Sequence, residues 1–170
     1  MGFFNKLFGG KSEPAKEVVK DNALYAHMVG KCVPVSEVPD PTFSEELLGK
    51  GIAVQPTVGK VYAPCDCTVA MTFDTKHAVS LETNFGAEIL IHVGLETVNL
   101  NGEHFTLHVA QGDKVKKGQL LIEVDLEAVK AAGLPTITPV LICNTDDYTT
   151  FHTTTGKAVT NADVVIELGK

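Results

Sequence analysis

Short apolar runs, each ended by turn-forming residues, recur along the chain from about residue 22 onward. Within a run, apolar and β-branched residues stand together or alternate with polar ones, as is typical of β-strands. The expected strands lie at 51–54, 59–64, 67–73, 105–109, 120–124, 140–142 and 164–168. Regularly spaced strands of this length predict an all-β fold, an antiparallel β-sandwich or barrel-sandwich hybrid.

Helical patterns are scarce, so we expect one or two short helices. Residues 44–48 can make a single turn. Residues 125–132 predict a short helix, because Gly133 directly behind them supplies a natural stop.

The segment 111–121 carries a pattern of its own, Gly-Asp-x-Val-x-x-Gly-x-x-Leu. It predicts a turn, a short strand and another turn, and it resembles one half-motif of biotinyl and lipoyl carrier domains. Residues 59–64 resemble the other half-motif. The pair indicates barrel-sandwich topology but does not fix the chemistry. A carrier also needs a lysine in a defined setting at a hairpin tip, which Lys60 and Lys76 lack.

Two histidines stand in neighbouring strand-like runs, His77 in 76–83 and His92 in 87–94, with Asn-Phe-Gly between the runs. A hairpin centred between residues 84 and 85 pairs 77 with 92, 79 with 90 and 81 with 88. The two imidazoles then face each other, with Cβ atoms roughly 4.5–5.5 Å apart. Such a pair can hold a transferable phosphoryl group, a metal ion or a proton relay.

Period-two alternation assigns the faces of the second run. Glu88, Leu90 and His92 share one face, while the aliphatic residues at 89, 91 and 93 share the other and are expected in the core. The histidine face is then the accessible side of the sandwich. Thr75, two residues before His77, is expected on the same strand face, where it can fix the tautomer of that ring.

Composition narrows the function classes. The chain has 170 residues, 44% of them hydrophobic, which suits one domain with a sizeable core. The net charge of −7 argues against nucleic acid as a partner and is compatible with docking onto basic protein surfaces. No apolar run is long enough to span a bilayer and nothing resembles a signal peptide, so a cytoplasmic location is expected.

The first 20 residues differ from the remainder. We expect 1–20 to be a flexible tail and 21–170 to be one domain. Phe4, Leu7 and Phe8 fall on one face at helical spacing, which could give weak membrane contact, although basic residues are few and a disordered tail is the simpler interpretation.

The four cysteines, at 32, 65, 67 and 143, include one Cys-x-Cys. On a strand both side chains of that motif point to one face, but no second pair completes a tetrahedral zinc site. We expect reduced, small, partly buried residues.

The segment 75–98 closely resembles the glucose-family enzyme IIA, the phosphocarrier of the bacterial phosphoenolpyruvate-dependent sugar phosphotransferase system. The resemblance rests on Gly-x-x-apolar-apolar-apolar-His-apolar-Gly at 86–94 and extends from about 51 to 168. It implies a protein that accepts a phosphoryl group from phospho-HPr and passes it to the IIB domain of a sugar permease. It also implies docking of regulatory target proteins by the unphosphorylated form.

The resemblance assigns roles by position. His92 matches the phosphorylated histidine, His77 its partner, and Thr75 the threonine that orients the partner. The positions that match partner-docking residues are Phe73, Leu90, Glu96 and Val98. Phenylalanine is common in the family where Leu90 stands, and Asp is found where Glu96 stands, which bears on partner choice and not on the chemistry.

Metal binding stays open as an alternative. No cofactor is required for phosphoryl transfer, but His77 and His92 alone would favour a structural or zinc role, and zinc needs a third ligand. Glu96 is near in sequence, and a partner's carboxylate can serve. A zinc peptidase of the same topology would need a further His-x-His set, which the chain lacks. The other histidines, at 27, 104, 108 and 152, have no companion motif; 104 and 108 are expected at the surface.

Overall fold

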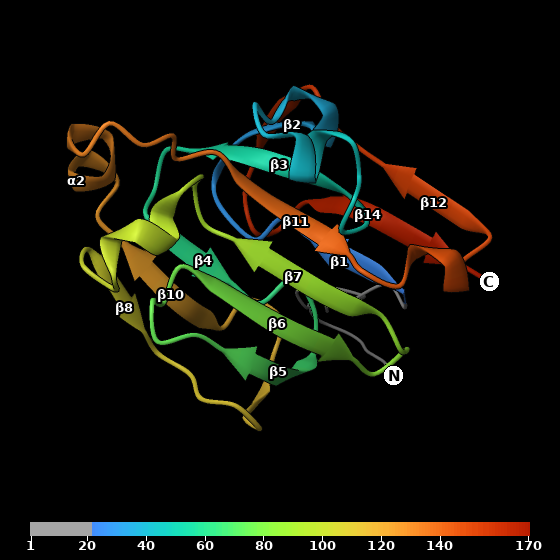
Figure 1. The fold of residues 1–170 in the computed structure, drawn as a ribbon. Coiled ribbons are helices and arrows are strands. Elements are labelled where there is room, and N and C mark those ends of the chain that lie inside the picture. Colours follow the sequence, from blue (N-terminus) through green and yellow to red (C-terminus); the bar gives the residue numbers. More distant parts are fainter. Residues whose placement is uncertain (1–21) are drawn as a thin grey trace, which may run out of the picture.

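The computed structural model describes residues 22–170, which form antiparallel sheets with two short helices. Figure 1 shows the largest sheet crossing the molecule, flanked by two smaller ones. That sheet has eight strands, in the order β13 (Lys157–Val159), β2 (Gly30–Pro34), β3 (Lys50–Pro56), β11 (Thr138–Ile142), β7 (Glu88–His92), β6 (Ala78–Thr83), β5 (Cys67–Thr72) and β9 (Lys114–Val115). The predicted all-β antiparallel architecture is confirmed.

Each smaller sheet has three strands. One is ordered β1 (Ala23–Tyr25), β14 (Val164–Gly169) and β12 (Thr150–Thr153), and the other β4 (Lys60–Tyr62), β10 (Leu120–Val124) and β8 (Phe105–Leu107). The 3-10 turns are η1 (Val35–Glu37), η2 (Thr97–Leu100) and η3 (Thr145–Asp147). Within 22–170 no helix is long and apolar enough to cross a membrane.

The two helices differ in how well the sequence predicted them. α2 (Leu126–Ala131) begins after Asp125, whose carboxylate accepts from the Ala128 N–H, and ends before Gly133 at φ +82°, as expected. The turn expected at 44–48 is wrong. α1 spans Pro41–Ser44, because Asp40 caps it and Pro41 fits its first position, whereas Glu46 has a left-handed φ of +60°.

The predicted turn–strand–turn at 111–121 is present. Gly112 and Gly118 take φ values of +93° and +84°, and β9 lies between them. The Val69 N–H donates to the Asp113 carbonyl, and the Gly112 N–H to the Val69 carbonyl. These bonds fasten the segment to β5.

The register of β6 against β7 is one residue away from the expected one. Ala78 pairs with His92, Val79 with Ile91 and Leu81 with Ile89. The expected pairing of 77 with 92 is therefore wrong. The loop has three residues, not two, and its third residue, Gly86, has φ +89°.

This register places aliphatic side chains opposite one another in the core. Val79, Leu81, Ile89 and Ile91 are all at most 1% exposed, and Val93 is equally buried. The face assignment for β7 is confirmed, whereas residues 79 and 81 lie on the core face and not beside His92. A slip by one residue would bring this whole apolar set to the surface.

His27 is fully buried, between β1 and β2. Its Nε2 donates to the Thr138 carbonyl at 2.9 Å, and its Nδ1 has no hydrogen-bond partner in the part of the chain that the structure describes. Burial lowers the pKa of this imidazole to about 4, against the opposing effect of the Thr138 bond. His27 is therefore neutral at pH 7.

We expect the free energy of unfolding to decrease as the pH is lowered, because His27 is harder to protonate in the folded chain than in the unfolded chain. The unfolded chain takes up this proton near pH 6.5 and the folded chain only near pH 4, so acid favours unfolding across that interval. The loss reaches about 3 kcal/mol at pH 4 and is complete only below that pH. Urea titrations between pH 7 and 5 should show a shallower pH dependence in His27→Gln, which keeps an amide donor for Thr138 but does not titrate. Equal slopes in the two proteins would contradict this.

Candidate functional site

His92 ends β7 with its ring fixed by the main chain. Its Nδ1 lies 2.8 Å from the Gly94 carbonyl oxygen. Because a carbonyl only accepts, Nδ1 carries the proton and the lone pair is on Nε2. Gly94 has φ +72°, and a Cβ there would lie 2.7 Å from the Pro135 carbonyl oxygen. The chain can take this path only with glycine.

His77 stands just before β6, where the chain leaves regular strand geometry. Lys76 has φ +59°, and its N–H donates to the Phe73 carbonyl, closing a turn. The Thr75 Oγ1 lies 2.7 Å from the His77 Nδ1. The expected contact between Thr75 and His77 is present, but a turn produces it and not strand alternation.

The two imidazoles meet edge to face despite the shifted register. Their ring centroids lie 4.8 Å apart at an interplanar angle of 84°. The carbonyl of His77 accepts from the Val93 N–H at 2.7 Å, so His77 stands opposite Val93 in the ladder and is only 7% exposed. The rings therefore meet although the register differs by one residue from the predicted one.

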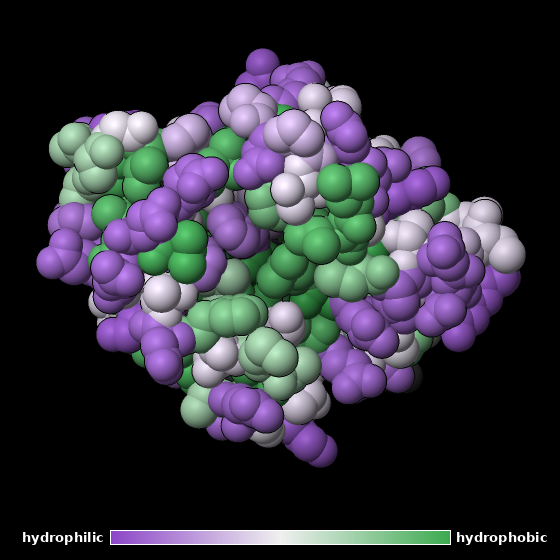
Figure 2. Space-filling view, in the orientation of Figure 1, coloured by the Kyte–Doolittle hydropathy of each residue, from purple (hydrophilic) through white to green (hydrophobic). Residues whose placement is uncertain are grey.

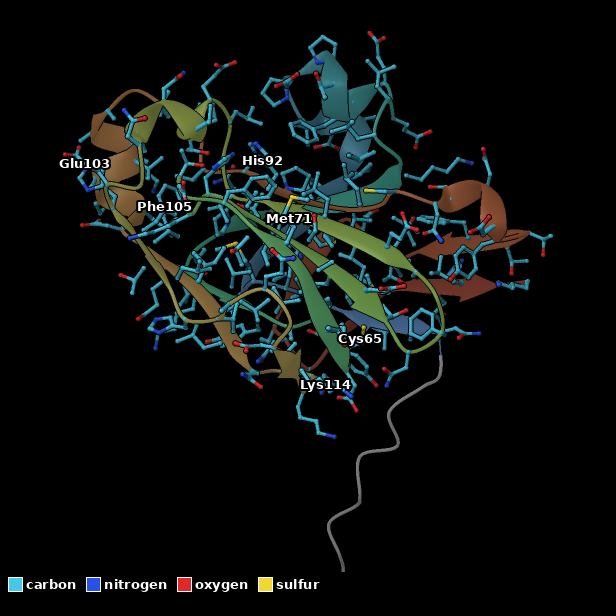
Figure 3. All side chains as sticks on the ribbon, turned by 60° about the horizontal axis from the view of Figure 1, so that its bottom comes forward. Cys65, Met71, His92, Glu103, Phe105 and Lys114 are labelled. Carbon is cyan, nitrogen blue, oxygen red and sulfur yellow. The ribbon has the colours of Figure 1, made fainter. Side chains whose placement is uncertain are left out.

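Aromatic rings line the pair on both sides. The ring of Phe43, from α1, lies 5.0 Å from the His92 ring, and the ring of Phe73 lies 6.0 Å from the His77 ring. Figure 3 shows His92 among side chains at one end of the large sheet. These rings exclude water from the imidazoles on those sides.

Electrostatics keep both imidazoles neutral at pH 7. Burial and the repulsion of His92 lower the pKa of His77 to about 4. Burial also lowers the pKa of His92, opposed by the Gly94 bond and the carboxylates of Asp40 and Glu96. A neutral imidazole keeps a lone pair on its free nitrogen, and that lone pair is a nucleophile.

The four expected docking residues are buried to different depths. Phe73 and Leu90 are half-buried, Glu96 is exposed, and Val98 is 45% exposed. Glu96 has φ +61° and accepts a long bond, 3.4 Å, from the Asn99 amide. Figure 2 shows apolar residues gathered in the middle of the face over β7 and β11.

Two residues near His92, Asp40 and Phe43, were not predicted from the sequence. Asp40 caps α1 and acts on the charge of His92, and Phe43 from the same helix packs on its ring. The Asp-Pro start of α1 was a readable helix signal. That this helix contacts a histidine about 50 residues further along the chain was not readable from local pattern.

Neither the remaining histidines nor the acidic residues complete a metal centre. No group of three or more His, Cys, Asp or Glu able to hold a metal ion occurs within residues 22–170. His104 and His108 are exposed, as expected, and the Nε2 of His108 lies 2.8 Å from a Glu123 carboxylate oxygen. His152 is exposed as well.

In this pair of neutral imidazoles His77 is buried, His92 is half-buried, and the Nδ1 proton of His92 is fixed while its Nε2 is unprotonated, which is an arrangement that a histidine phosphoryl carrier needs. Comparison with known proteins points the same way. Residues 22–148 match the family model for the phosphoenolpyruvate-dependent sugar phosphotransferase system, EIIA 1. A glucose-specific EIIA component of Halalkalibacterium halodurans is 45% identical over 88% of this chain and 87% of its own.

Two further relatives extend the match. A glucose-specific EIIA component of Haemophilus influenzae is 38% identical over the full length of both chains. The solved structure of glucose permease IIA from Mycoplasma capricolum superposes with a TM-score of 0.79 at 34% identity, covering 85% of this chain and 93% of that one. The chain belongs to the EIIA 1 family of the sugar phosphotransferase system, and it is a phosphocarrier.

We expect His77 to titrate near pH 4 in the folded protein, and its pKa to rise in His92→Ala because the repulsion of His92 is lost. Histidine side-chain NMR measures both midpoints. The midpoint of His27, also expected at about 4, serves as an internal control that should not move. An unchanged His77 midpoint in the variant would show that the rings do not interact electrostatically.

Proposed function

We propose that His92 accepts a phosphoryl group from phospho-HPr and passes it to a cysteine on the IIB domain of a glucose-type sugar permease. The observation that carries this proposal is the bond from the His92 Nδ1 to the Gly94 carbonyl, which leaves Nε2 as the free nucleophile. The names of the relatives, glucose-specific EIIA components, support a glucose-type permease as the acceptor.

The transfer needs little covalent chemistry from the protein. The Nε2 lone pair of His92 forms a bond to phosphorus while the bond to the donor's leaving group breaks. The loose transition state carries charge on three equatorial oxygens, so positioned donors stabilise it. In our proposal the Thr75 hydroxyl donates to the His77 Nδ1, and the Nε2–H of His77 donates to one of those oxygens. The second step reverses the first toward the acceptor thiolate.

Neutrality of the pair serves both steps. A protonated His92 would have no lone pair with which to attack phosphorus. Two protonated imidazoles would also repel each other, because their ring centroids are 4.8 Å apart. The depressed pKa of His77 and the lowered pKa of His92 keep both nucleophile and donor competent at pH 7.

We also propose that HPr, the IIB domain and regulatory target proteins dock in turn on the surface beside the two imidazoles. The proposed contact residues are Phe73, Leu90, Glu96 and Val98. The side chain of Val98 is 45% exposed, so a partner protein can reach it. Residues 21–170 act as one phosphocarrier domain in this proposal, in the cytoplasm. The tail, residues 1–20, lies outside the described residues, and its flexibility and weak membrane contact stay predictions.

Zinc binding is a secondary proposal. His77 and His92 offer two imidazoles, and the described chain supplies no third ligand beside them. A carboxylate from a docked partner would complete a tetrahedral site with water. The phosphoryl transfer itself requires no cofactor in this proposal.

The first test is phosphorylation with phosphoenolpyruvate, enzyme I and HPr. We expect acid-labile label on the wild type, none on His92→Ala, and transfer slowed about 100-fold or more in His77→Ala, since one transition-state donor is lost. His152→Ala changes an exposed histidine and serves as the matched control, with normal labelling. Label that persists in His92→Ala would contradict the proposal that His92 is the phosphoryl acceptor.

The second test concerns docking. We expect Val98→Asp to raise the Kd for HPr or IIB about tenfold, because a charge would be buried in an apolar contact. Calorimetry measures the change, and Val58→Asp, 39% exposed on the turn between β3 and β4, is the matched control. Equal affinities for wild type and Val98→Asp would remove Val98 from the docking surface.

A further inference from the structure

Two buried threonine side chains hold the peptide unit between Val93 and Gly94. The Thr97 hydroxyl donates to the Val93 carbonyl at 2.5 Å, and the Gly94 N–H donates to the Thr138 hydroxyl at 3.4 Å. Both threonines are fully buried. The carbonyl and the N–H of a planar trans peptide point in opposite directions. The two bonds therefore fix the tilt of one peptide plane from both of its edges.

A second hydrogen bond sets the direction of the Thr138 hydroxyl. Its Oγ1 donates to the Thr136 carbonyl at 2.9 Å, so its proton is committed and its lone pairs remain for the Gly94 N–H. Thr138 is the first residue of β11, the strand that pairs with β7 near the end where His92 stands. The hydroxyl therefore ties the turn after β7 to the neighbouring strand of the large sheet.

The next peptide unit, between Gly94 and Leu95, carries the carbonyl that accepts from the His92 Nδ1. Its N–H donates to the Pro135 carbonyl at 3.1 Å. Gly94 joins the two units, and a glycine has no Cβ to limit rotation between them. The bonds that hold the first unit therefore restrict how far the second can tilt. The ring of His92 follows that carbonyl, because its Nδ1 proton is bonded there.

We propose that Thr97 and Thr138 are positioning residues for phosphoryl transfer at His92. By holding the Val93–Gly94 peptide unit they keep the Gly94 carbonyl in place, and this carbonyl orients the imidazole so that its Nε2 faces the incoming phosphorus. Neither threonine touches the reacting atoms. The inference rests on the proposed function, in which the Nε2 lone pair of His92 is the nucleophile.

The orientation of the ring matters because the attacking nitrogen, the phosphorus and the leaving group must lie roughly in line. A misplacement of about 1 Å can cost about 100-fold in rate. Buried main-chain groups need hydrogen-bond partners in any protein, so a purely structural role for the two hydroxyls predicts lost stability alone. A positioning role predicts that kcat falls as well.

The experiment replaces each threonine with valine, which has a similar shape but no hydroxyl. With phospho-HPr as donor, we expect kcat to fall about tenfold or more in Thr97→Val and in Thr138→Val, with KM unchanged because both residues are buried. Thr97→Ser and Thr138→Ser keep the hydroxyl and should recover most of the rate. Thr83→Val is the matched control, since the buried Thr83 hydroxyl accepts from the Ala87 N–H at 2.9 Å in the loop after β6.

NMR of the unphosphorylated chain gives a second result that needs no transfer. In both valine variants the His92 Nδ1–H resonance should move upfield as its bond to Gly94 weakens, and the pKa of His92 should fall because that bond raises it. An unchanged kcat or an unchanged resonance in a folded valine variant would overturn the proposal for that threonine. An equal loss of kcat in Thr83→Val would overturn it for both.

Hydrogen exchange of the wild type keeps the proposal testable if a valine variant does not fold. We expect the Gly94 N–H to be protected as strongly as the amides of β7, because Thr138 accepts from it in the buried turn. An unprotected Gly94 N–H would contradict the proposal. A wild type that takes up no label from phospho-HPr would contradict the proposed function instead, and the NMR comparison would still stand.

Discussion

The burial of four aliphatic side chains at the centre of the β6–β7 pair is the constraint on which the site depends. Val79 stands opposite Ile91 and Leu81 opposite Ile89, each almost without exposure. Burying such side chains contributes on the order of 1.5–3 kcal/mol each, so the hairpin has one strongly preferred register. That register fixes where β7 ends, and His92 is its last residue.

The two imidazoles lie where water solvates them poorly, and the bond to Gly94 leaves the Nε2 of His92 unprotonated. Burial alone would make them inert structural groups. What distinguishes His92 is that its remaining proton is committed to a main-chain oxygen, while nearby Asp40 and Glu96 limit how far its pKa falls. His77 lacks such carboxylate support, and burial with the repulsion of His92 lowers its pKa to about 4. The same pair of residue types thus has unequal chemistry because of its surroundings.

Sequence reasoning predicted the strands, the accessible face of β7 and the grouping of His77, His92 and Thr75. It reached the pairing of His77 and His92 for a partly wrong reason. A two-residue turn was assumed, and Gly86 with its positive φ extends the loop by one. The rings still meet because Lys76 breaks the strand before β6 begins, a local event that alternation rules do not describe. The contact of Phe43 with His92 could not be predicted from the sequence, because it depends on how α1 packs over the sheet.

The acceptor that orients His92 is a backbone oxygen, and this has a consequence for how the site can change over generations. No side-chain substitution deletes that oxygen, so an ordinary point mutation does not change which nitrogen of His92 carries the proton. A substitution at Gly94 would instead disturb the path of the main chain. A Cβ there would lie 2.7 Å from the Pro135 oxygen and 2.8 Å from the Thr97 methyl carbon. The absence of a side chain at Gly94 is therefore what keeps the tautomer of His92 the same from one generation to the next.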